Sequence, residues 1–142
     1  MGSSLIQFHI EEIDFKFTEK RKTSHWIKKV LQEEGFTLGH LNYIFCGDEY
    51  LLEINQTYLN HNTYTDIITF NNSEEEEIIE GDIFISIERI RENAEKYSHS
   101  FKDELDRVIV HGVLHLCGYK DKTKTEQTLM REKEDYYLAK RV

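Results

Sequence analysis

The sequence predicts an α+β domain in which helices pack on a small mixed sheet. Several short segments alternate apolar and polar residues with the period of a half-buried strand. Longer segments place apolar residues three and four positions apart, which is the period of a helix, and the two kinds of segment occur in mixed order. The 142 residues contain no proline, no glycine- or serine-rich linker and no internal repeat. We therefore expect a single domain over residues 1–142.

The strand pattern occurs in four segments: residues 6–17, 38–46, 65–70 and 82–87. In the second segment Leu41, Tyr43 and Phe45 fall on one face, which predicts that this face is buried. The third and fourth are rich in β-branched residues, and an acidic stretch separates them. This arrangement predicts an antiparallel pair joined by a long loop.

Helical spacing predicts a helix that follows a cap at Thr23 or Ser24 and ends near Gly35, and helices over residues 48–58, 86–98, 101–117 and 125–139. The helix over residues 101–117 is apolar nearly all round, so we expect it to be buried. The last helix is polar by comparison.

The net charge of -9 argues against broad coating of nucleic acid, because phosphate backbones attract basic surfaces. Much of the acid lies in four consecutive glutamates at positions 74 to 77, which we expect to form a solvated loop. Basic residues gather between positions 16 and 29, and again at Lys120, Lys122 and Lys124. A local binding site for nucleic acid therefore stays compatible with the acidic total.

No apolar run approaches the roughly 20 residues needed to span a bilayer, and the first residues lack the pattern of a secretory signal. We expect a cytoplasmic protein with no membrane partner. Cys46 and Cys117 are expected to be reduced thiols in that compartment. Since no CxxC occurs, a cysteine-based zinc ribbon is excluded.

The buried helix carries His111 and His115, four positions apart, so both side chains leave one face about 40° apart. A buried polar group without a partner costs about 1–3 kcal/mol, so each imidazole needs either a metal or a protein partner. Gly118 can end the helix in the left-handed conformation and let the chain return Asp121 over the histidines. The pattern predicts one zinc ion held by His111, His115 and Asp121. Cys117 is the softer alternative ligand, but it lies about 200° from His115 around the helix.

The spacing H-x-x-x-H-x-x-G-x-x-D also matches the metal frame of metzincin peptidases. Those enzymes carry a glutamate directly after the first histidine as general base, whereas this chain has Gly112. Peptide hydrolysis is therefore disfavoured. Three protein ligands leave a fourth position for water, which favours hydrolytic chemistry over a closed structural site.

The same residues resemble the YbeY family of single-strand endoribonucleases and rRNA maturation factors. The family signature H-G-x-L-H-L-x-G-Y-D-H is similar to His111-Gly-Val-Leu-His115-Leu-Cys-Gly-Tyr-Lys120-Asp121, and a second family stretch is similar to residues 54–70. Gly81-Asp82-Ile83 matches the start of a family strand. The resemblance implies an α+β fold, one zinc ion, and action on single-stranded or ribosomal RNA. It also implies ribosomal particles as partners in ribosome biogenesis.

Three positions depart from the family pattern. Asp121 stands where the family usually has histidine, Lys120 replaces an aspartate, and Leu59 replaces an arginine suited to holding a phosphate. His61 and Lys120 are the nearest candidates to supply positive charge, so with His111 and His115 they form the expected catalytic set. Leu59 favours a second hypothesis, a non-catalytic ribosome assembly factor with a structural zinc. Whether a water or the RNA 2′-hydroxyl attacks is left open by the sequence.

Overall fold

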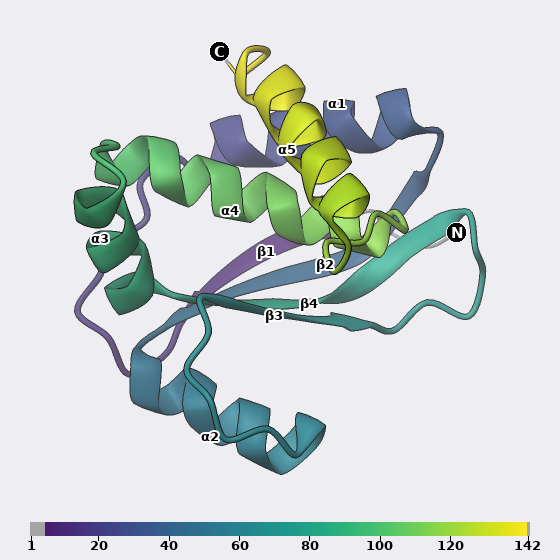
Figure 1. The fold of residues 1–142 in the computed structure, drawn as a ribbon. Helices are drawn as coiled ribbons and strands as arrows, with labels where there is room; N and C mark the ends of the chain where they lie inside the picture. The colour runs from purple at the N-terminus through teal and green to yellow at the C-terminus, as the bar shows by residue number, and fades with distance from the viewer. Residues whose placement is uncertain (1–4, 142) are drawn as a thin grey trace.

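The computed structural model describes residues 5–141. Its elements, in chain order, are β1 (Leu5–Ile10), α1 (Lys20–Glu34), β2 (Thr37–Cys46), α2 (Asp48–Leu59), β3 (Ile67–Asn71), β4 (Ile78–Ser86), α3 (Ile87–Lys96), α4 (Phe101–Leu116) and α5 (Lys124–Leu138). Helices α1, α4 and α5 lie over one face of the sheet and α2 covers the other (Figure 1). The expected α+β architecture, with helices packed on a small sheet, is confirmed.

The four-stranded sheet has the order β1-β2-β4-β3 and is mixed. Strands β1 and β4 both run parallel to β2, whereas β3 pairs antiparallel to β4 with Ile67 opposite Ile85. The predicted antiparallel pair is therefore present, and a loop that contains the four glutamates joins its strands. β3 forms one edge of the sheet, and α4 packs directly against it and against β4.

Helix α4 lies at the centre of the core. Val108, Ile109, Val110, Val113 and Leu114 are all buried, which confirms the prediction from its apolar composition. On β2, the Tyr43 hydroxyl donates to the Ile109 carbonyl oxygen at 2.9 Å, across the interface between helix and sheet. Packing on both sides fixes the position of α4, and hence of every side chain that it presents.

The strand expected over residues 6–17 is shorter in the structure. Pairing with β2 stops at Ile10, opposite Phe45, since β2 itself ends one residue later and offers no further partner. Glu12 then takes a left-handed backbone conformation with φ of 52°, which breaks the extended run. Phe15 and Phe17 still pack on the aromatic cluster around Phe45, so their alternation reflects burial rather than strand pairing.

Two other boundaries differ from those expected by three residues or more. α1 begins at Lys20 with Glu19 at its N-cap, three residues before Thr23, which is buried and accepts a hydrogen bond from Arg141. β4 begins at Ile78, four residues earlier than the pattern indicated. No described helix has the length and apolar character needed to cross a membrane.

We predict that the acidic loop contributes little to stability. All four glutamates at positions 74 to 77 are exposed, and the hydrogen bonds of Glu75 and Glu77 in this loop are made by their main-chain atoms. Replacing them with serine should change the free energy of unfolding by no more than about 0.5 kcal/mol. Ile79→Ala, at a buried position nearby, is the control and should cost about 2–5 kcal/mol. Denaturant unfolding measures both, and a serine variant as unstable as the control would contradict the prediction.

Candidate metal centre

Helix α4 presents His111 and His115 from one face, with ring centroids 4.5 Å apart. The helix repeat brings residues four apart into this position, one turn above the other. Both rings are partly exposed, although most of the helix around them is buried. The centre therefore lies at the edge of the hydrophobic core, where one face of α4 is accessible to solvent.

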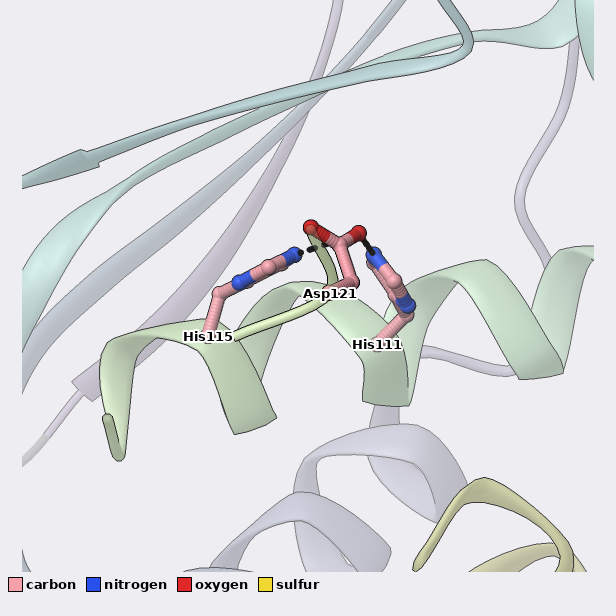
Figure 2. A group of neighbouring side chains, drawn as sticks. All are labelled: His111, His115 and Asp121. Carbon is pink, nitrogen blue, oxygen red and sulfur yellow. Dashed lines mark hydrogen bonds and ion pairs between the residues drawn. The ribbon is translucent and has the colours of Figure 1, made fainter. Parts of the chain in front are cut away.

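Asp121 returns to the histidines through the turn that follows α4. Gly118 has a φ of 105° and its N–H donates to the His115 carbonyl oxygen, so the helix ends there and the chain reverses. Asp121 Oδ2 then lies 3.3 Å from His111 Nε2 and 3.2 Å from His115 Nε2. Figure 2 shows both imidazoles turned toward this carboxylate. The predicted return of Asp121 is found in the structure.

Hydrogen bonds on the far side of each ring determine which nitrogen faces Asp121. His115 Nδ1 lies 2.9 Å from the Tyr119 carbonyl oxygen, and His111 Nδ1 lies 2.6 Å from Glu134 Oε2. A carbonyl oxygen and a carboxylate oxygen can only accept, so both Nδ1 atoms carry the hydrogen. In the neutral rings, both Nε2 atoms then present a lone pair to Asp121.

This arrangement fits a metal ion. Two nitrogen lone pairs that face a carboxylate oxygen repel it unless a metal ion lies among them or a proton on the imidazole lies between the two atoms. In a tetrahedral zinc site with bonds of about 2.0–2.1 Å, neighbouring ligand atoms are about 3.3 Å apart. The two distances from Asp121 match that spacing, and the three ligand atoms lie within 4.8 Å of one another.

Cys117, the alternative ligand, is not part of this group. Its side chain packs against the hydrophobic core, as the position around the helix predicted. Burial raises the pKa of its thiol to about 12, so it stays protonated at neutral pH and is a poor metal ligand. Both cysteines are free thiols, as expected.

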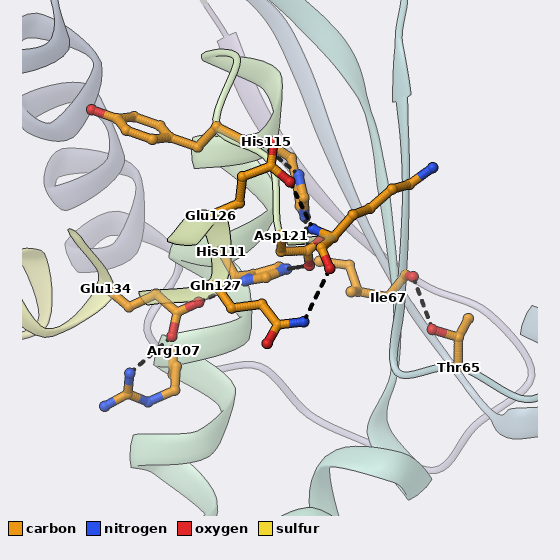
Figure 3. Close-up of polar contacts among 11 residues, drawn as sticks. Thr65, Ile67, Arg107, His111, His115, Asp121, Glu126, Gln127 and Glu134 are labelled. Atoms are coloured by element: carbon orange, nitrogen blue, oxygen red, sulfur yellow. Dashed lines mark hydrogen bonds and ion pairs between the residues drawn. The ribbon is translucent and has the colours of Figure 1, made fainter. Parts of the chain in front are cut away.

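Three side chains, those of His111, Glu134 and Arg107, form a series of polar contacts that extends from the centre toward the start of α4. Arg107 Nη1 donates to Glu134 Oε1 at 2.8 Å, and the other oxygen of Glu134 faces His111 (Figure 3). Burial acts to lower the pKa of His111, but the hydrogen bond and charge of Glu134 outweigh it and raise that pKa above its ordinary value. The surroundings therefore favour a positive charge at this imidazole.

The three candidate metal ligands line an open cavity of about 570 Å³ between α2, β3 and α4. His61 and Leu59 lie in its wall, so the structure places His61, one of the expected catalytic residues, beside the candidate ligands. Lys120 is exposed in the turn and is not among the lining residues, whereas Lys122 is. The lysine that lines the cavity is therefore Lys122, two residues after the expected Lys120.

Sequence reasoning missed Glu134 and Asp66. Glu134 shares the buried face of α5 with Met130 and Tyr137, at helical spacing, and a glutamate on an apolar face was the available signal. Asp66 lies in the cavity wall, and burial raises the pKa of its carboxyl group. It belongs to the stretch that resembles the family, but no spacing rule pointed to it.

Gly112 has a steric role. A Cβ atom there would lie 2.9 Å from Ile67 Cδ1 and 2.9 Å from Ile83 Cγ2, so the position faces the sheet. Its missing side chain lets α4 approach β3 and β4 closely. A glutamate at this position would enter the apolar interface, which removes the peptidase interpretation on geometric grounds as well.

Comparison with known proteins supports the family resemblance and the fold. The family model described as Endoribonuclease YbeY matches residues 5–141. The chain belongs to the YbeY family. Proteins named endoribonuclease YbeY from Flavobacterium psychrophilum and Cytophaga hutchinsonii are 53% and 48% identical to it, over 94% and 99% of both chains. The solution structure of TM1509 from Thermotoga maritima matches with a TM-score of 0.67 and 27% identity, covering 94% of this chain and 87% of that one.

We predict that the purified YbeY-family protein binds about one equivalent of zinc, since its three ligands make one site. His111→Ala and His115→Ala should lose it, because each removes one of three ligands. Elemental analysis after dialysis measures the content, and His25→Ala, at an exposed position on α1, is the control that should keep its zinc. Equal zinc in all of these proteins would contradict the assignment.

A second prediction concerns the third ligand. Asp121→Ala should weaken zinc binding by at least about tenfold, whereas Asp121→His should retain it because imidazole also binds zinc. Cys117→Ser should leave the affinity unchanged, since that thiol faces the core. Competition with a chromophoric chelator gives the affinities. Loss of zinc in Cys117→Ser but not in Asp121→Ala would show that the third ligand is Cys117 and that the assignment to Asp121 is wrong.

Proposed function

We propose that this protein is a zinc-dependent, single-strand-specific endoribonuclease that acts on ribosomal RNA in the cytoplasm, in rRNA maturation and ribosome quality control. The observation that carries the proposal is the three-ligand group in the wall of an open cavity. Three protein ligands leave a coordination position free for water or substrate, which is typical of catalytic rather than structural zinc. Membership of the endoribonuclease YbeY family supports RNA as the substrate.

A bound zinc ion supplies Lewis-acid chemistry: it stabilises negative charge on a phosphoryl oxygen and lowers the pKa of water. The chain's own residues hold the substrate. His61 and Lys122 line the cavity and can donate hydrogen bonds to phosphate oxygens. Lys120 remains a candidate for the same role from outside the lining. The cavity is open and is lined in part by the edge strand β3, and we infer that a flexible single strand can enter it more easily than a rigid duplex.

A non-catalytic assembly factor with a structural zinc is the second candidate, and Leu59 is the observation that favours it. This side chain is 40% exposed and lines the cavity at the position where the family pattern has arginine. An apolar side chain cannot hold a phosphate there. Such a protein would use the same surface to bind ribosomal RNA or ribosomal particles without cleaving them.

Cleavage of a labelled single-stranded RNA by zinc-loaded protein tests the proposal. We expect cleavage that a chelator abolishes and that added zinc restores. His115→Ala, purified in parallel, should be inactive and serves as the control for contaminating nuclease. Cleavage that survives chelation or the His115→Ala change would reject the enzyme. Tight binding of the inactive protein to ribosomal particles would then support the assembly factor.

Leu59→Arg should raise the rate of RNA cleavage by roughly tenfold or more, because a preorganised guanidinium stabilises charge that develops on the phosphoryl group. Leu59→Gln, which has no charge, is the control and should not raise it. Single-turnover kinetics measure the chemical step apart from binding. If Leu59→Arg changes nothing and His61→Ala or Lys120→Ala lowers the rate, the cation is already supplied by one of those residues.

A further inference from the structure

Glu134 is a buried carboxylate whose two oxygens are both engaged. Its side chain is 8% exposed, Oε1 accepts from Arg107 at 2.8 Å, and Oε2 accepts from His111 Nδ1 at 2.6 Å. A charge buried to this extent is costly unless it is paired and hydrogen-bonded. Glu134 is therefore held in one orientation by two residues of α4.

Glu134 acts on the metal centre from the outside. Its oxygen meets Nδ1 of His111, on the opposite side of the imidazole from Asp121, so it is not a ligand itself. The hydrogen bond fixes the tautomer that leaves Nε2 free, and it holds the plane of the ring (Figure 3). A carboxylate in this position also makes the imidazole a stronger donor to a metal.

The contact joins two helices. Arg107 and His111 are four residues apart on α4, so both reach Glu134 on α5 from the same face. Arg107 also pairs with Asp135 at 2.7 Å, but the Asp135 side chain is 58% exposed and no contact of it with His111 is found among the described residues. Glu134 alone of these two neighbours connects α5 to the metal ligand.

We propose that Glu134 is a positioning residue for His111, and that its hydrogen bond couples the docking of α5 to metal binding. The inference rests on the metal centre of the proposed function. Coupling of this kind is reciprocal: if docked α5 strengthens metal binding, bound metal strengthens the docking of α5 to the same degree. The C-terminal helix thereby becomes part of the metal site without contributing a ligand.

Glu134→Gln tests the inference, and Asp135→Asn is its matched control. Both replace one carboxylate of α5 that bonds Arg107 by an amide of the same size, but only the first removes the carboxylate from His111. Competition with a chromophoric chelator should give a zinc affinity about 10- to 100-fold weaker in Glu134→Gln and nearly unchanged in Asp135→Asn. Circular dichroism at the same temperature must show that both variants are folded.

Two further measurements separate positioning from general stability. In wild type and Asp135→Asn, the His111 Nδ1 proton should give a downfield, slowly exchanging NMR signal typical of a bond to carboxylate, and Glu134→Gln should shift or lose it. Zinc should slow amide hydrogen exchange along α5 in wild type and Asp135→Asn, and much less in Glu134→Gln.

Three results would overturn the inference. Equal zinc affinity of wild type and Glu134→Gln would show that the hydrogen bond does not position His111. Equal weakening in Glu134→Gln and Asp135→Asn would indicate a general loss of negative charge on α5. Failure of the wild-type protein to bind zinc at all would reject the proposed metal centre, and the coupling with it.

Discussion

The site depends on one constraint: both Nδ1 hydrogens of the α4 histidines are already donated. His115 gives its hydrogen to the Tyr119 carbonyl oxygen and His111 gives its own to Glu134. In the neutral rings the remaining nitrogens face the Asp121 carboxylate as acceptors, at distances of 3.2 and 3.3 Å. Three acceptor atoms so close together favour a positive charge among them, either a metal ion or the proton of a charged imidazole, and the hydrogen bonds behind the rings impose this arrangement.

Those hydrogen bonds exist because the surrounding fold holds their acceptors in place. The Tyr119 hydroxyl donates to Glu34 of α1 at 2.7 Å, so the turn that carries the Tyr119 carbonyl oxygen is anchored to a second helix. Glu34 is further held by Tyr137 and Lys133 of α5. Burial acts to raise the pKa of Glu34, but these donors outweigh it and lower that pKa, so the anchor stays ionised. One histidine is thus oriented through α1 and the other through α5.

The sequence predicted the part of this centre that short spacing encodes. Two histidines four apart, a glycine that ends the helix and an aspartate three residues later determine their mutual positions almost without the rest of the fold. Glu134 lies 23 residues from His111, and only the packing of α5 on α4 brings the two together.

The elements of the fold were likewise predicted where short-range patterns encode them. Apolar periodicity located the four strands and five helices found within residues 5–141, but it marked Phe17 as strand because periodicity reports burial and cannot report a missing pairing partner.

The three departures from the family pattern compensate one another in charge. At neutral pH an aspartate in place of a ligand histidine adds one negative charge, and leucine in place of arginine removes one positive charge. Lysine in place of aspartate at position 120 restores both. The total charge around the candidate metal centre is therefore that of the family pattern, although the chain as a whole carries -9. The distribution of the charge differs from that of the family pattern. The family pattern has its positive charge at position 59, in the cavity wall formed by the end of α2, whereas this chain has it at Lys120, in the turn that carries Asp121. Because exposed charges are screened beyond about 8–10 Å in physiological salt, this local arrangement governs the attraction of a phosphate more than the net charge does.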